Sequence, residues 1–168
     1  MTSMRPDVPY VIRPAKAGDV AGCAYVHHTS WFETYATLLP AAHWETDTLE
    51  SRTARWHRWL DGGALVTVAE RGERIIGIAI DGAGRKVGEN EPVRERELYS
   101  LYVLADHHGT GVGQALLETV LAPRTPAQVW VAEENKRARR FYERNEFLPD
   151  GARHVDERLG LAEVRHVR

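Results

Sequence analysis

The chain has 168 residues, of which 43% are hydrophobic and 27% charged, the composition of one ordinary globular domain. Its formal net charge of −2 lacks the excess of Lys and Arg that marks nucleic-acid binders. Cys23 is the only cysteine, which excludes an internal disulfide and a cysteine zinc site. No secretory leader or membrane-spanning stretch is visible. We therefore expect a flexible N-terminus at residues 1–9 and one cytoplasmic domain over residues 10–168.

The first half predicts one strand, two helices and a β-hairpin. In chain order these are a strand at residues 10–13, a helix that Asp19 caps, a helix at about 41–60, and strands at 65–70 and 75–80. Trp44, Trp56 and Trp59 are expected to bury the helices on a sheet. Trp31 and Tyr35 lie four residues apart on one helix face and are the better candidates for lining a substrate pocket.

The second half alternates strands with helices after a predicted mobile loop at residues 82–94. The strongest strand pattern covers residues 97–103, and its alternation places Glu97, Tyr99, Leu101 and Val103 on one face. The further elements are a helix at 115–121, a strand at 128–131, a helix at 136–144 that Asn135 caps, a strand and bend at 147–156, and a strand at 161–167.

A glycine-rich segment, residues 107–114, links the strongest strand to a helix. Glycines at every second position let the backbone approach a ligand and direct several N–H groups at it, while the helix N-terminus adds partial positive charge. This arrangement suits a pyrophosphate. The alternative is a tight strand-to-helix turn that binds nothing.

Two other phosphate motifs fit less well. A Walker A loop is excluded because no Lys-Ser/Thr follows the glycines. A dinucleotide-binding fold has some support, since Glu133 follows the next strand about twenty residues after the loop. Gln114 replaces its third glycine, however, and five residues separate Val103 from Gly109, too many for that fold's tight first turn.

Three motifs in order resemble the GCN5-related N-acetyltransferase (GNAT) family. They are Glu97-x-x-x-Leu101-Tyr-Val103, His108-Gly-Thr-Gly-Val-Gly113, and Asn135-x-x-Ala138-x-x-Phe141-Tyr142-Glu143 followed by Phe147. The resemblance implies an α/β fold with a mixed, mostly antiparallel sheet of six to seven strands. About four helices would flank this sheet, and a V-shaped split would separate strands 4 and 5.

The resemblance also implies roles for single residues. Tyr142 would protonate the departing thiolate, and Glu97 occupies the strand position where many members keep a general base. The implied cofactor contacts are Leu101, Tyr102, Val103, His108, Gly109, Thr110, Gly111, Val112, Gly113, Gln114, Asn135, Ala138 and Tyr142. The sequence departs from the family pattern at His108, where Arg or Gln is usual, and at Glu146, where Gly is usual; we expect Asn145 to supply the positive φ there.

The implied activity is transfer of an acetyl group from acetyl-CoA to a primary amine by direct attack in a ternary complex. No metal takes part, and Cys23 is disfavoured as an acyl carrier because it lies far in sequence from the cofactor strand. The acceptor would be a small molecule or a peptide, with no nucleic acid or membrane as partner; a homodimer is left open. The alternatives are a non-catalytic acyl-CoA sensor or interaction domain and, as another enzyme class, a dinucleotide-dependent oxidoreductase.

Overall fold

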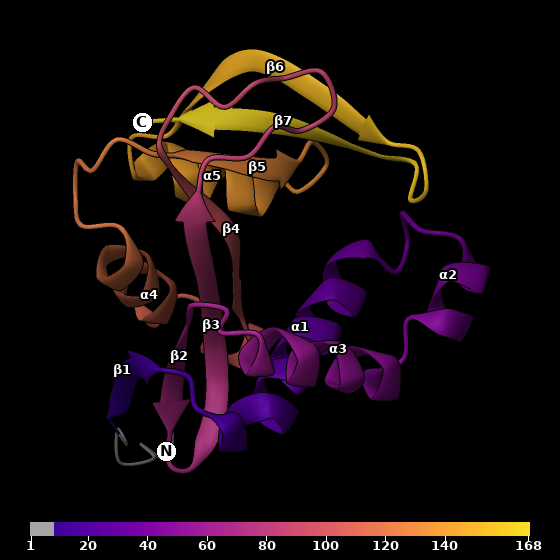
Figure 1. Ribbon diagram of the computed structural model, residues 1–168, viewed down its shortest axis with the longest axis vertical. Coiled ribbons are helices and arrows are strands. Elements are labelled where there is room, and N and C mark those ends of the chain that lie inside the picture. Colours follow the sequence, from indigo (N-terminus) through magenta and orange to yellow (C-terminus); the bar gives the residue numbers. More distant parts are fainter. Residues whose placement is uncertain (1–8) are drawn as a thin grey trace, which may run out of the picture.

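The computed structural model describes residues 9–168, so the predicted flexible segment at residues 1–9 lies, except for Pro9, outside the described residues. The described chain combines helices with strands (Figure 1). Its elements are β1 (Tyr10–Pro14), η1 (Ala17–Asp19), α1 (Val20–Tyr35), α2 (Ala41–Thr46), α3 (Leu49–Asp61), β2 (Val66–Arg71), β3 (Arg74–Ala83), β4 (Arg96–Val103), η2 (Ala105–His107), α4 (Val112–Val120), β5 (Gln128–Ala132), α5 (Lys136–Arg144), β6 (Leu148–Asp156) and β7 (Leu161–Val167).

All these strands form one seven-stranded sheet in the order β1-β2-β3-β4-β5-β7-β6. Neighbouring strands are antiparallel except β4 and β5, which are parallel. The parallel pair is joined only where Glu97 and Leu98 meet Gln128 and Val129, and the two strands separate beyond that point. The predicted fold class, including the split between strands 4 and 5, is confirmed.

Helices cover both faces of the sheet (Figure 1). On one face α1 and α3 pack through Val26 and Trp56 against Val68 of β2 and Ile78 of β3. On the other face lie α4 and α5, and Leu117 of α4 shares a core with the β5 side chains. These two layers hold β4 between α1 and α4, which fixes the strand that borders the split.

The predicted helix at residues 41–60 is wrong as a single element, because the chain leaves the helical conformation at Asp47 (φ −85°, ψ 71°). Thr48 then caps α3, and its hydroxyl accepts a hydrogen bond from the Ser51 N–H at 3.1 Å. The Asp47 carboxylate accepts a hydrogen bond from the buried guanidinium of Arg52. Asp and Thr favour such breaks because their side chains compete with the helical backbone bonds.

The predicted alternation along β4 is also wrong. The ladder with β3 pairs Leu98 with Asp81 and Ser100 with Ile80, which leaves Tyr99 as the extra residue of a β-bulge. Leu98 and Leu101 consequently both pack against the core beneath α4 and α5. Glu97 therefore lies on the opposite face from Leu101.

The segment at residues 82–94 is held to the rest of the fold, contrary to the expected mobile loop. The Gly84 N–H donates to the Glu95 carbonyl at 2.9 Å, and the Val93 N–H donates to Oε1 of Gln128 at 2.8 Å. Arg165 of β7 donates to the Glu91 carbonyl at 2.8 Å, which ties the segment to the second half of the sheet.

Within residues 9–168, no helix has both the length and the apolar character needed to cross a bilayer.

Candidate active site

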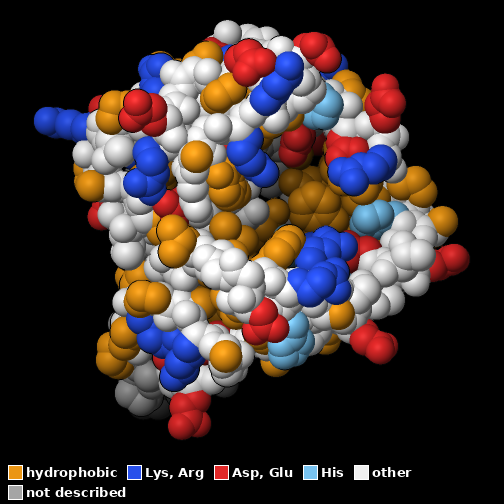
Figure 2. All heavy atoms as spheres, viewed as in Figure 1, with side chains coloured by type: hydrophobic (Ala, Val, Ile, Leu, Met, Phe, Trp, Pro, Cys, Tyr) orange, Lys and Arg blue, Asp and Glu red, His pale blue; other side chains and the backbone are white. Residues whose placement is uncertain are grey.

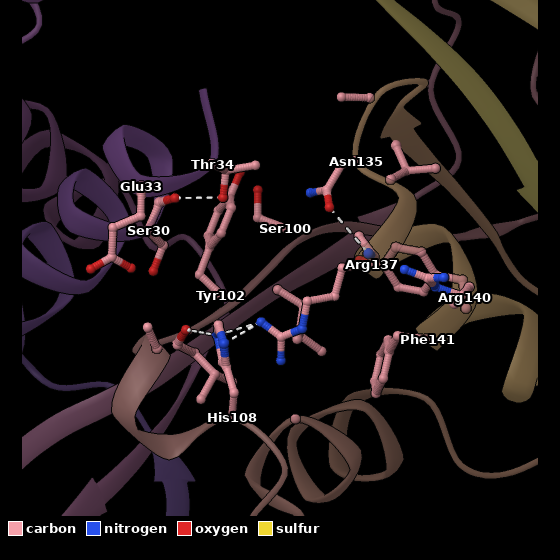
Figure 3. A pocket seen from close by; sticks show the side chains of 18 of the residues that line it. Ser30, Glu33, Thr34, Ser100, Tyr102, His108, Asn135, Arg137, Arg140 and Phe141 are labelled. Atoms are coloured by element: carbon pink, nitrogen blue, oxygen red, sulfur yellow. Dashed lines mark hydrogen bonds between the residues drawn. The ribbon is translucent and has the colours of Figure 1, made fainter. Parts of the chain in front are cut away.

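A cavity of about 750 Å³ opens where β4 and β5 separate. Its walls come from α1, β4, the glycine-rich loop, β5, α5 and β7. Figure 2 shows a hollow with hydrophobic side chains in its floor and Lys or Arg side chains around its mouth. Figure 3 shows side chains of α1 facing those of α5 across the cavity, with Ser100 and Tyr102 of β4 between them.

The glycine-rich loop shapes one end of this cavity. Gly109 and Gly111 have φ of 74° and 89°, a region that strains any residue with a side chain. Gly111 is the N-cap of α4, so the free N–H groups of the first helical turn begin there. A side chain at Gly109 would meet open space, which leaves room for a ligand over the backbone. The positive helix end and the accessible N–H groups have the properties that the predicted anion site requires.

Cationic side chains of α5 border the same end. Arg137, Arg140 and Arg144 all line the cavity, and they recur at intervals that place them on one side of the helix. Arg137 donates a hydrogen bond to the His108 ring, whose Nε2 also lies 2.8 Å from the Val103 carbonyl. Sequence reasoning missed these three arginines, although their spacing along α5 was visible.

The edge of β4 that faces β5 is unpaired from Tyr99 onward. Leu101, Tyr102 and Val103 all line the cavity along this stretch. Unpaired strand groups readily accept an added strand or an extended ligand. The structure thus offers a backbone edge where the sequence predicted one.

Asn135 and Tyr142 both line the cavity, Asn135 as the N-cap of α5 and Tyr142 from the last turn of the helix. The Asn135 side chain accepts a hydrogen bond from the Ala138 N–H at 3.1 Å, which confirms the predicted N-cap. Tyr142 lines the cavity while only 6% of its surface is exposed. Burial, with a smaller effect of the nearby Tyr35, raises the pKa of Tyr142 above its usual value. Its phenol therefore stays protonated at neutral pH.

The opposite wall is formed by α1, with Ser30, Trp31, Glu33, Thr34 and Tyr35 lining the cavity. The Trp31 and Tyr35 rings lie 4.2 Å apart between centroids, so the predicted pair does share one helix face. Tyr35 is only 5% exposed. Burial raises the pKa of Tyr35, hydrogen bonding with Asn135 opposes that rise, and the Glu163 carboxylate adds to it.

Glu97 does not line the cavity. Its fully buried carboxylate forms an ion pair with Arg85 at 2.5 Å and accepts a hydrogen bond from Gln128 Nε2 at 2.7 Å. The Arg85 backbone N–H donates to the same group at 3.1 Å. These bonds tie β4, β5 and the 82–94 segment together, and Glu97 does not share the face of Leu101 that alternation assigned to it.

Most of the other predicted contacts do meet in the cavity. Its lining includes His108, Gly109, Gly111, Gly113, Gln114, Asn135 and Ala138, but not Thr110 or Val112. Thr110 donates its hydroxyl proton to the His107 carbonyl, and Val112, the first residue of α4, is buried against the sheet. Sequence reasoning also missed Trp130 and Glu163, whose only signal was their place on alternating strands.

The remaining chemical groups lie elsewhere. Cys23 is fully buried in the core between α1, α3 and the sheet, and that burial raises the pKa of its thiol to about 12. Among residues 9–168, no cluster of three or more His, Cys, Asp or Glu side chains is arranged to hold a metal ion.

A sheet split beside a glycine-rich helix start, with an unpaired strand edge leading away from it, defines an α/β protein of the acetyltransferase class. The GNAT acetyltransferase domain matches residues 62–149. The chain is 30% identical over 129 residues to an uncharacterized N-acetyltransferase of Bacillus subtilis, covering 74% of this chain and 72% of that protein. It is 26% identical over 167 residues to a probable N-acetyltransferase of Mycobacterium tuberculosis, covering 93% and 90% of the two chains.

Among solved structures, the PaiA N-acetyltransferase of Thermoplasma acidophilum in complex with coenzyme A aligns with a TM-score of 0.65. The two chains are 19% identical, and the alignment covers 95% of this chain and 99% of that one. The protein belongs to the GNAT family of N-acetyltransferases, as its motifs indicated. The doubly wound parallel sheet that a dinucleotide-binding fold needs is not what the described residues form.

Proposed function

We propose that this N-acetyltransferase moves the acetyl group of acetyl-CoA to a primary amine by direct attack within a ternary complex. The observation that carries the proposal is the continuity of the cavity, which runs from the glycine-rich loop past the free edge of β4 to α1 and β7. Donor and acceptor would thus meet in one space. The acceptor is a small molecule or a peptide amine, and a cytoplasmic location fits a chain with one cysteine.

The donor would lie along the α5 side of the cavity. The N–H groups around Gly109 and Gly111 would bind its pyrophosphate, and Arg137, Arg140 and Arg144 would balance the phosphate charges. The pantetheine arm would follow the unpaired edge of β4 beside Asn135. Coenzyme A bound to a structural relative supports this reading of the site.

The chemistry then needs three groups. The amine must lose a proton before it can attack the thioester, and the carbonyl oxygen needs a donor as it gains negative charge. A backbone N–H of β4 near Val103 would serve as that donor. The departing thiolate needs a proton, and the Tyr142 phenol, which stays protonated at neutral pH, would supply it.

Calorimetry and a thiol-release assay test the proposal together. We expect acetyl-CoA binding and release of free CoA with at least one member of a broad panel of primary amines. Tight binding with no release from any amine would instead favour the non-catalytic sensor. Thermal stabilisation by NAD but not by CoA would contradict the assignment of the glycine-rich loop.

A further inference from the structure

We propose that Glu163 is the catalytic base of this enzyme: it binds the ammonium group of the acceptor and takes its proton. The inference rests on the proposed amine transfer and adds a residue outside the three family motifs. Glu163 lies on β7 opposite Ala132 of β5, and both residues line the cavity. Glu163 therefore borders the cavity near the end of β5 that is separated from β4.

Glu163 is distinguished by what it does not contact. In the described part of the chain, the cavity is lined by two carboxylates, Glu33 and Glu163. Glu33 is exposed on α1, whereas Glu163 is partly buried. Within residues 9–168 no hydrogen bond or ion pair engages the Glu163 carboxylate, in contrast to Glu97, which forms an ion pair with Arg85 and accepts a hydrogen bond from Gln128. Burying an unpaired carboxylate is unfavourable in free energy, and a cationic ligand that pairs with the carboxylate removes that penalty.

The charges around Glu163 come from several elements. Burial raises the pKa of its carboxyl group, and Asp156 of β6 and Glu97 of β4 add to the rise. His154 of β6 and Arg85 of the 82–94 segment oppose it. Tyr35 of α1 also faces this group. A carboxylate whose pKa lies above the ordinary value is a stronger base. It also suits general base catalysis better, because the optimal pKa of the base lies near the working pH.

Tyr35 lies near both groups that are proposed to transfer protons. The Glu163 charge raises the pKa of Tyr35, and Tyr35 in turn contributes to the raised pKa of Tyr142. Glu163 and Tyr142 thus both lie near the buried Tyr35 ring. A thioester bound in this part of the cavity would have a base and an acid near its reacting atoms.

The proposed step balances as follows. A Glu163 oxygen forms a bond to one ammonium proton, and the electron pair of that N–H bond becomes the nitrogen lone pair. This pair forms the C–N bond at the thioester carbon, and the C=O π pair moves to oxygen. When that pair returns, the C–S bond breaks and the sulfur takes the Tyr142 proton. The phenol regains the second nitrogen proton, and Glu163 later releases its own to water.

The test compares Glu163→Gln with Glu50→Gln, which removes an exposed carboxylate of α3 that does not line the cavity. The probes are tyramine, tryptamine, putrescine and an N-terminal alanine peptide, and kcat/KM is measured against pH with the best of them. We expect Glu163→Gln to lower kcat/KM about 100-fold at pH 7, within the range for a lost general base. The acid limb that reports ionisation of Glu163 should disappear. The rate of the variant should instead increase in proportion to the fraction of the acceptor present as free amine. Glu50→Gln should keep the parent profile.

Calorimetry with acetyl-CoA shows that a variant is folded, and both variants should bind it like the parent. Should Glu163→Gln fail this control, Glu163→Asp replaces it and should keep an acid limb with a shifted midpoint. A parent-like acid limb in the glutamine or aspartate variant would overturn the role of Glu163 and leave the proposed function intact. A parent enzyme that binds acetyl-CoA and releases no CoA with any amine would contradict the proposed function, and the base with it.

Discussion

The two walls of the cavity are built in different ways. The wall proposed to bind the cofactor, called the cofactor wall, consists of β4, residues 104–111, α4 and α5, and it offers mainly backbone groups: an unpaired strand edge and a helix start. The wall proposed to bind the acceptor, called the acceptor wall, consists of α1 with Trp130 and Glu163, and it offers side chains. A backbone site tolerates many sequences but needs fixed spacing and glycines. A side-chain site depends on which residues the fold brings together.

The largest expected effect is on the cofactor wall, at Gly111. Its φ of 89° strains any side chain by roughly 1–2 kcal/mol, and a carboxylate there would repel phosphate groups at the start of α4. We expect Gly111→Glu to reduce acetyl-CoA binding by about 100-fold or more, as measured by calorimetry.

Gly63 provides the matched control. It also has positive φ, at 81°, and open space around it, but it ends α3 outside the cavity. Gly63→Glu should cost similar stability and leave acetyl-CoA affinity at the parent level. If both variants bind acetyl-CoA equally well, the glycine-rich loop is not the phosphate site.

The next effect concerns the core beneath the acceptor wall. The Trp56 indole N–H donates to His27 Nδ1 at 3.2 Å, and burial lowers the pKa of His27 to about 3. The unfolded chain binds this proton more readily, so stability should fall as the pH drops from about 6.5 toward 3, by at most about 1.4 kcal/mol per pH unit. Protonation of His27 Nδ1 would place its N–H against the indole N–H of Trp56, and two donors cannot form a hydrogen bond with each other.

Urea unfolding at pH 7, 5.5 and 4.5 measures this dependence. His27→Gln, which cannot take up the proton, should flatten the fall over this range, whereas replacement of the exposed His57 of α3 by Gln should not. Equal slopes in the parent and His27→Gln would show that His27 titrates normally.

Tyr142 tests the cofactor wall by chemistry alone. Tyr142→Phe keeps the ring packed beside Phe147 and deletes the hydroxyl. We expect kcat to fall about 100-fold, as for other lost general acids, with acetyl-CoA affinity little changed. The rate should not recover as the pH rises, since the free amine is not what the variant lacks. An unchanged kcat with chemistry rate-limiting would assign the proton to water or another group.

The sequence predicted the cofactor wall better than the acceptor wall for a physical reason. Gly109 and Gly111 shape a turn and Asn135 caps a helix, and such local geometry leaves a fixed spacing in the chain. The family resemblance then pointed to Tyr142. The face of β4 on which Glu97 lies was predicted wrongly, because one bulged residue, Tyr99, reverses the face that alternation assigns. Bulges leave no reliable spacing signal.

The acceptor wall depends on contacts between distant segments. Glu163 reaches the cavity only because β7 pairs with β5 and so brings it opposite Ala132. The break at Asp47 is local instead, since Thr48 caps α3 and Asp47 pairs with Arg52 five residues later. Hydrophobic periodicity describes neither feature, because the first joins distant strands and the second depends on polar side chains.

The smallest effect concerns the turn after α5, which positions Phe147 beneath the cofactor wall. The expectation that Asn145 takes the positive φ is wrong: Asn145 has φ −100° and Glu146 has φ 67°. Asn145 instead donates to the Phe141 carbonyl and accepts from Gln114, so its side chain is committed to α4 and α5. The left-handed conformation therefore falls on Glu146, whose side chain makes this conformation strained.

We expect Glu146→Gly to raise the free energy of unfolding by about 0.5–1 kcal/mol, because relief of roughly 1–2 kcal/mol of strain is partly offset by the entropy of glycine. Glu146→Ala removes the same carboxylate and keeps the strain, so it should show no such gain. Urea denaturation of the two variants gives the difference directly, and equal stabilities would mean that the turn stores no backbone strain.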